Sequence, residues 1–270
     1  MPAPCSRTKC FQLSSNKEQS SKFKVQRTKI KDQKSKTKDQ SPLIIAIDGP
    51  SGAGKSTLGR MLARALKLLY IDTGSMYRAV ALAVIESSVN SDDDLAVGSL
   101  ASRVDIDLRG DPEAIQVNLE GRDVTEAIRD EEVTHMSSVV STIPAVRRAM
   151  VNRQRQMGRR GAVLNGRDIG TVVFPDADVK FYLTALPQER AQRRYVEERA
   201  QDPNVDFEAT FVEMIERDQR DSTREDSPLK IADDAVVIDS TGLSINDVFE
   251  KMMAVVRERT KQGRGERVTR

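Results

Sequence analysis

The sequence predicts an α/β fold in which a parallel sheet of five strands is flanked by helices. Short, continuously apolar runs recur along the chain, as expected for strands that are buried on both faces. Segments with helical spacing of apolar residues separate these runs, which is the alternation typical of a parallel sheet. One stretch in the first half of the chain breaks the alternation and predicts a small antiparallel β insert.

Composition excludes several classes of protein. Of the 270 residues, 38% are hydrophobic and 31% are charged, which is typical of a globular protein, and no run approaches the roughly 18 apolar residues of a membrane span. The net charge is only +2, so the whole chain does not resemble a nucleic-acid binder. His135 is the single histidine, which disfavours Ser-His-Asp hydrolysis and multi-histidine metal sites. Cys5 and Cys10 both lie near the N-terminus, which excludes a disulfide framework in the core and fits a reducing cytoplasm.

The first 40 residues are rich in Lys, Ser, Gln and Thr and contain few large apolar side chains. Such a segment buries too little surface to offset its ordering entropy, so residues 1–40 are predicted to be a disordered tail. It lacks the apolar stretch of a signal peptide. Two interpretations stay open: a solvated extension without function, and contact with RNA or another anionic surface. Residues 263–270 are predicted to be a second disordered tail, which leaves 41–262 as the folded domain.

The first strand is expected at residues 43–47, bounded by Pro42 and by Gly49. The other four strands of the sheet are expected at 69–71, 162–164, 179–183 and 235–238. Helices are expected at 56–66, 76–85, 144–160, 187–199, 208–220 and 245–260. In the insert, Ile115, Val117 and Leu119 alternate with polar residues before a Glu-Gly turn, which predicts antiparallel strands.

A glycine-rich loop between the first predicted strand and the first predicted helix is the strongest motif. It fits the eight-residue phosphate-loop pattern and consists of Gly49, Pro50, Ser51, Gly52, Ala53, Gly54, Lys55 and Ser56. Glycines let backbone N–H groups converge on phosphate oxygens, and the helix N-terminus adds its positive dipole end. Lys55 is expected to bridge the β and γ phosphates of ATP, and Ser56 to offer its hydroxyl to Mg²⁺. This context disfavours the alternative of a turn that binds nothing.

The chain lacks the Asn-Lys-x-Asp motif with which switch GTPases recognise guanine, and it lacks the longer signature regions of transport or helicase ATPases. Its size and its single phosphate loop favour an ATP-dependent kinase that acts on a small molecule.

Candidate residues for the acceptor follow two other predicted strands. Residues 72–78 form a polar turn that is expected to face the same crevice as the phosphate loop, with Arg78 as a candidate ligand of an acceptor phosphate. Residues 166–170 place Arg167 and Asp168 at the same edge. The alternatives are helix packing for Tyr77, a solvated charge for Arg78, and a tight turn with a surface ion pair for the second segment.

Two further clusters of arginine lie on consecutive predicted helices. Arg217, Asp221 and Arg224 share one helix face if the helix continues. The preceding helix carries Arg190, Arg193 and Arg194, and the polar segment 201–206 between the helices is predicted to close as a lid. Solvated helix ion pairs are the alternative. Guanidinium groups match phosphate oxygens well, and phosphoryl transfer needs positive charge, which favours ligand binding.

Together these motifs resemble bacterial cytidylate kinases, of the nucleoside monophosphate kinase superfamily. The resemblance rests on residues 49–57, 72–78, 166–175, 216–221 and 239–241, in order, within a match from about 43 to 260. It implies the P-loop kinase fold, with an enlarged monophosphate-binding insert at 98–141 and a short lid at 194–207. It also implies a monomer that phosphorylates CMP and dCMP with ATP and Mg²⁺, in the cytoplasm.

The resemblance further implies roles for individual residues. The catalytic groups would be Lys55, Arg167, Arg217 and Arg224. ATP would be bound by the phosphate loop as far as Thr57 and by Arg194. Cytosine would be recognised by Ser138, Arg147 and Asp168, and the phosphate or ribose of CMP by Thr73, Tyr77, Arg78, Arg167, Arg217, Asp221 and Arg224. Mg²⁺ would be held by Ser56 together with phosphates and water.

One residue departs from the family pattern. Asn165 stands where cytidylate kinases commonly have the first Asp of Asp-Gly-Arg-Asp. We expect Asn165 to keep the hydrogen bonding of that position, while a negative charge near the metal is missing. Two other functions stay open from the sequence: a kinase for another monophosphate such as UMP, and an RNA-binding regulator whose core senses nucleotides.

Overall fold

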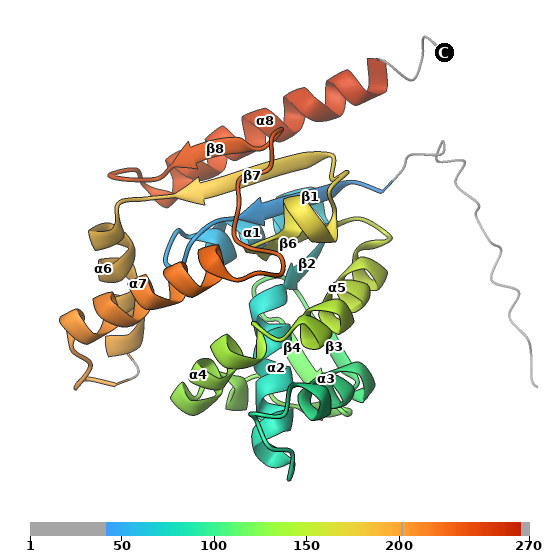
Figure 1. Cartoon of the computed structure of the whole chain (residues 1–270). Helices are drawn as coiled ribbons and strands as arrows, with labels where there is room; N and C mark the ends of the chain where they lie inside the picture. The colour runs from blue at the N-terminus through green and yellow to red at the C-terminus, as the bar shows by residue number, and fades with distance from the viewer. Residues whose placement is uncertain (1–41, 201, 266–270) are drawn as a thin grey trace, which may run out of the picture. The chain divides into compact units, whose positions relative to one another are not determined.

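Five parallel strands form the central sheet, in the order β2, β6, β1, β7, β8 (Figure 1). Their bounds are Ile44–Asp48 (β1), Leu69–Asp72 (β2), Ala162–Gly166 (β6), Val179–Thr184 (β7) and Val236–Asp239 (β8). Every neighbouring pair is parallel, which confirms the predicted number and direction of the strands.

The computed structural model describes residues 42–200 and 202–265, with side chains as far as residue 261. The prediction of a disordered tail at 1–40 therefore lies outside the described residues, as does the prediction for 266–270. No helix in the described part of the chain has the length and apolarity needed to cross a bilayer.

The helices that flank the sheet are α1 (Lys55–Leu66), α2 (Thr73–Glu86), α5 (Pro144–Gly158), α6 (Pro187–Arg199), α7 (Phe207–Thr223) and α8 (Ile245–Gly265). Helix α2 begins three residues before its predicted start, because the Asp72 side chain accepts a hydrogen bond from the Gly74 N–H and caps the helix. Helix α8 continues past its predicted end at residue 260, to a residue that the sequence assigned to the C-terminal tail.

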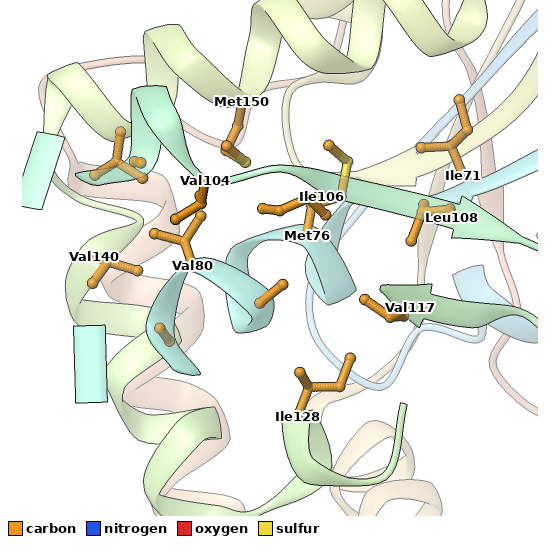
Figure 2. Close-up of a cluster of buried hydrophobic side chains, with 14 of the residues drawn as sticks. Ile71, Met76, Val80, Val104, Ile106, Leu108, Val117, Ile128, Val140 and Met150 are labelled. Atoms are coloured by element: carbon orange, nitrogen blue, oxygen red, sulfur yellow. The ribbon is translucent and has the colours of Figure 1, made fainter. Parts of the chain in front are cut away.

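Two hydrophobic cores cover the two faces of the sheet. Along β1, Ala46 belongs to one core, whereas Ile45 and Ile47 belong to the other, as expected from the alternation of side chains along a strand. The first core contains residues of α2 and α5, and Figure 2 shows Met76 and Val80 of α2 among its side chains. The second core contains residues of α1 and α8.

The insert between α2 and α5 combines strands with helices. It contains α3 (Asp94–Arg103), β3 (Ile106–Arg109), β4 (Gln116–Leu119), β5 (Arg122–Asp123), the 3-10 helix η1 (Ala127–Arg129) and α4 (Glu131–Val140). Its three strands are antiparallel, as predicted. The sequence did not predict α3 and α4, so the insert is more helical than expected. In both segments the apolar residues form only short, interrupted runs. These residues become buried because α3 packs on α5 and α4 packs on α2.

Candidate functional site

A cleft of about 1380 Å³ lies where β1, β2 and β6 end. The strand order changes direction at β1, because β6 and β2 lie on one side of it and β7 and β8 lie on the other. Open α/β sheets bind ligands at such a change of direction. The lining includes the loop after β1, the start of α2, the turn after β6 and residues of α6 and α7. The structure thus brings the predicted donor and acceptor segments to one cleft.

The glycine-rich loop has a conformation that glycine permits and a side chain would prevent. Gly52 and Gly54 have φ values of 70° and 86°. A Cβ atom at Gly52 would lie 2.6 Å from the carbonyl oxygen of Arg190, so the loop also passes too close to α6 for a side chain. Helix α1 begins at Lys55 without a side-chain cap, which leaves its first N–H groups available to an anion.

Residues of α6 and α7 hold the glycine-rich loop in place through hydrogen bonds to Ser51. The Asp218 carboxylate accepts a hydrogen bond from the Ser51 N–H at 2.8 Å, and Arg190 donates to the Ser51 carbonyl oxygen at 2.8 Å. Arg190 and Asp218 are also paired with each other, and Arg190 is buried. Arg190 therefore positions the phosphate loop, whereas the sequence had placed it in a phosphate-binding cluster. Asp218 lies within the 216–221 motif, but the sequence assigned it no role.

Four cations that line the cleft form no ion pair with the described residues, and one of them is Arg60. The other three are Lys55, Arg78 and Arg217. Burial and the neighbouring Arg167 hold the pKa of Lys55 well below its usual value and lower the pKa of Arg217 to about 10. Burial and nearby guanidiniums also lower the pKa of Arg78. The cleft is thus short of negative charge, which an anionic ligand would supply.

Other cations in or near the cleft have acidic partners. The Arg167 Nε lies 2.7 Å from an Asp221 carboxylate oxygen, and Arg224 lies 3.5 Å from the other oxygen of the same carboxylate. Burial lowers the pKa of Arg167, but the surrounding carboxylates, Asp221 first among them, together outweigh burial, and the pKa is raised overall. On α6, the Arg194 Nε lies 2.5 Å from Glu198.

A buried ion pair joins two of the residues predicted to recognise cytosine. The Arg147 Nη2 lies 2.5 Å from Asp168, and their side chains are only 2% and 8% exposed. The guanidinium of Arg147 also lies over the ring of Tyr77, 5.6 Å from its centre, and burial raises the pKa of Tyr77 to about 12. Ser138, the third predicted residue, is half-buried on α4, and no hydrogen bond in the described part of the chain joins its side chain to this pair.

Ser56 is the one residue that the sequence analysis assigned to Mg²⁺. Its hydroxyl oxygen accepts a hydrogen bond from the side-chain amide of Asn165 at 3.0 Å. The hydroxyl of Thr73, which was predicted to contact CMP, donates a hydrogen bond to the backbone carbonyl oxygen of Asn165 at 2.7 Å. The described residues contain no group of three or more His, Cys, Asp or Glu that would hold a metal by themselves. The Ser56 hydroxyl is an oxygen ligand of the kind that Mg²⁺ accepts, and Mg²⁺ commonly keeps several waters and binds largely through substrate phosphates.

Two residues near the site were not predicted. The Asp48 carboxylate, at the end of β1, accepts hydrogen bonds from the N–H groups of Ile169 at 2.8 Å and Gly170 at 2.7 Å. Burial raises the pKa of Asp48 to about 6, although these two hydrogen bonds oppose the shift. The signal in the sequence was an acidic residue directly after an apolar strand. Arg129 of η1 also lines the cleft, with no sequence signal that set it apart.

Comparison with known proteins agrees with this geometry. The sequence profile of the family described as cytidylate kinase matches residues 45–258. A cytidylate kinase of Geobacter sp. (strain M21) is 49% identical over 222 residues, which cover 82% of this chain and 95% of that protein. A cytidylate kinase of Solibacter usitatus is 51% identical over 225 residues, covering 82% of this chain and 95% of that protein. A third, from Rhodococcus jostii, is 45% identical and covers 83% of this chain and 98% of that protein.

Proposed function

This chain belongs to the cytidylate kinase family, and we propose that it transfers the γ-phosphoryl group of ATP to CMP or dCMP in the cleft at the ends of β1, β2 and β6. The observation that carries the proposal is the set of three cations, Lys55, Arg78 and Arg217, that share this cleft without a carboxylate partner in the described residues. Two phosphorylated ligands would supply the missing negative charge.

We assign the donor side to the loop after β1. The N–H groups at the start of α1 would bind the β and γ phosphates of ATP, and Lys55 would neutralise the charge that develops between them. Its Nζ donates to the Pro50 carbonyl oxygen at 2.6 Å, which holds the ammonium across the loop. Arg194 lines the same cleft on α6 and would contact the donor phosphates from the opposite side.

The acceptor side would use the turn after β6 and the start of α2. Arg78, Arg167 and Arg217 would bind the acceptor phosphate, because planar guanidinium groups match its oxygens. The buried pair of Arg147 and Asp168 would recognise the cytosine base, with an acceptor oxygen and donor N–H groups held in fixed positions.

Catalysis would come from placement and charge. The attacking oxygen of a monophosphate is already anionic, so no strong general base is needed, and the described cleft presents no histidine or cysteine to act as one. The cations let two mutually repelling anions lie in line, and closure of the α6–α7 hairpin would exclude water. Mg²⁺, held by Ser56 and the phosphates, would supply neutralisation of the transferred group.

The proposed donor and acceptor sites can both be built from residues of a single chain, so we propose that the protein acts as a monomer. This assignment concerns only the cleft within residues 42–265.

The test is an assay of ADP release with ATP and each of CMP, dCMP, UMP, AMP and GMP. We expect CMP and dCMP to be the preferred acceptors of the unmodified chain. In Asp168→Asn the preference for CMP over UMP should fall by at least about tenfold in kcat/KM, because one good hydrogen-bonded contact to a base contributes on the order of 1–3 kcal/mol to discrimination.

Asp234→Asn is the matched control. Asp234 pairs with the buried Lys180 at 2.8 Å, and neither residue lines the cleft. This variant should lose stability but keep the acceptor preference. UMP as the best acceptor of the unmodified chain would refute the proposed function. An unchanged preference in a folded Asp168→Asn variant would refute the assignment of the base site.

A further inference from the structure

Arg194, the residue of α6 assigned above to the donor phosphates, is paired with a carboxylate inside the cleft. Its Nε atom lies 2.5 Å from Glu198, and the two side chains are 31% and 25% exposed. Both residues line the cleft. The guanidinium that would bind ATP therefore already has an anionic partner within the protein.

A second helix holds the same carboxylate in place. The other oxygen of Glu198 accepts a hydrogen bond from the hydroxyl of Thr210 at 2.8 Å, and Thr210 is buried on α7. Helix α6 packs on α7 (Figure 1), and the ring of Tyr195 meets the ring of Phe207 edge to face at 5.8 Å. Because the carboxylate is fixed between the two helices, it would stay in place if the guanidinium of Arg194 turned toward a ligand.

An ion pair within one helix is ordinarily explained as support for that helix. Here the acidic residue lies in the last turn of α6, where the negative end of the helix dipole disfavours it. Glu198 also follows Arg194 by four residues, which is the less favourable order for such a pair. Stabilisation of the helix therefore does not explain why Glu198 occupies this position.

Arg194 lies within electrostatic reach of two of the unpaired cations of the cleft. Burial lowers the pKa of Arg78 and that of Arg217, and the charge of Arg194 is among the neighbours that lower both values further. Phosphate oxygens drawn to these cations would therefore also attract Arg194. Glu198 and the phosphates then compete for one guanidinium.

We propose that Glu198 is a positioning residue that acts through Arg194 and holds its guanidinium until the phosphates of ATP displace the carboxylate. Binding exchanges the ion pair for contacts between Arg194 and phosphate oxygens, so the loss of the pair offsets part of the attraction for ATP. After the γ-phosphoryl group has passed to the acceptor, the donor carries less negative charge, so Glu198 pairs with Arg194 again more readily and favours release of ADP. This inference rests on the proposed function, because it requires a nucleotide beside Arg194.

The test measures binding of a non-hydrolysable ATP analogue with Mg²⁺ by isothermal titration calorimetry. We expect Glu198→Gln to bind the analogue about fivefold more tightly than the unmodified chain, which is the upper range for the loss of a partly exposed ion pair. In the Arg194→Ala background the same substitution should change the affinity by less than about twofold, because the guanidinium for which Glu198 competes is gone. A gain in affinity that depends on Arg194 is not expected if Glu198 only stabilises the fold.

Glu197→Gln is the matched control. Glu197 is the preceding residue of α6 and also lines the cleft, but it is not paired with Arg194 in the described part of the chain. This variant should stay within about twofold of the unmodified chain.

The proposal is overturned if Glu198→Gln gains less than about twofold in affinity, or if the gain persists without Arg194. An equal gain in Glu197→Gln would also overturn it, because removal of any negative charge from this part of the cleft would then be sufficient. If the unmodified chain does not bind the ATP analogue at all, the proposed function fails, and this inference fails with it.

Discussion

Arginine side chains in and around the cleft differ in whether a carboxylate neutralises them. Arg190 is buried with Asp218 behind the phosphate loop, and Arg147 is buried with Asp168 at the predicted base site. Removing one partner of such a pair leaves an uncompensated buried charge and costs about 3–5 kcal/mol. Arg217 has no ion-pair partner among the described residues and a pKa lowered to about 10. The same residue type therefore holds the phosphate loop in the case of Arg190, whereas Arg147 and Arg217 are proposed to bind ligands.

At this scale we predict the effect of Lys55→Ala. The CMP-dependent rate should fall by about a hundredfold or more, because the change removes a positive charge aimed at the transferred phosphoryl group. The variant should fold and melt at the same or a higher temperature, since Lys55 is a buried cation without an ion-pair partner in the described part of the chain. The assay of ADP release and a thermal melt followed by circular dichroism measure the two quantities.

Lys251→Ala provides the control, because Lys251 is exposed on α8 and does not line the cleft. It should leave both the rate and the melting temperature unchanged. A Lys55→Ala variant with the full rate would remove the phosphate loop from the mechanism.

Among the elements, the end of β1 and the turn after β6 are joined by one carboxylate. Asp48 is the last residue of β1 and receives two backbone hydrogen bonds from the π-helical turn Ile169–Val173. This turn directly follows Arg167 and Asp168, so Asp48 couples the strand before the phosphate loop to the segment assigned to the acceptor. Burial removes the carboxylate from water and disfavours its charged form, which raises the pKa of Asp48 from 3.8 to about 6.

The raised pKa predicts how stability depends on pH. Between about pH 4 and about pH 6 the unfolded chain has released the Asp48 proton while the folded chain retains it, so the free energy of unfolding contributed by this group falls as pH rises. The total fall is on the order of 3 kcal/mol, at about 1.4 kcal/mol for each pKa unit. Asp48→Asn should lack this fall, which urea unfolding at several pH values would show as a flatter profile.

Asp178→Asn is the control for the pH experiment. Asp178 also accepts a hydrogen bond from a backbone N–H of β1, at 2.8 Å from the Ile44 nitrogen, but it is exposed. Its profile should follow that of the unmodified chain. Equal slopes for the unmodified chain and Asp48→Asn would show that the carboxylate does not carry a raised pKa.

Within residues 42–265, the two cores and the cleft form a complete unit for the proposed reaction. The family match at residues 45–258 lies inside this range, and every residue assigned to a ligand lies there too. The insert packs on the same core as α2 and α5, which places Arg129 at the cleft although it lies far from the other lining arginines in sequence.

We therefore predict that deletion of residues 1–40 leaves the CMP-dependent rate and the melting temperature unchanged. Deletion of residues 1–47 should abolish folding, because it removes most of β1, which pairs with both β6 and β7 in the centre of the sheet. Kinase assays and thermal melts of the two truncated chains would check this. Retention on immobilised RNA should fall with the shorter deletion if the Lys-rich segment binds RNA. A large loss of kinase activity on deletion of 1–40 would contradict the prediction.

Local patterns in the sequence were enough for the parallel sheet and for the glycine-rich loop that lines the cleft. A strand that is buried on both faces must be apolar along its length, and a phosphate loop needs glycines, Lys55 and Ser56 in consecutive positions, so both features are readable without knowledge of contacts. The resemblance to cytidylate kinases likewise depended on short motifs, and the family comparison confirms it.

Only the tertiary structure decided which charges face a ligand and which hold the fold. Arg190 and Asp218 lie on different helices, and Asp48 contacts a turn more than a hundred residues away, so no local pattern shows which partner each of these charges meets. Burial and pairing depend on neighbours that are distant in sequence, and these neighbours are set when the sheet brings its strands together.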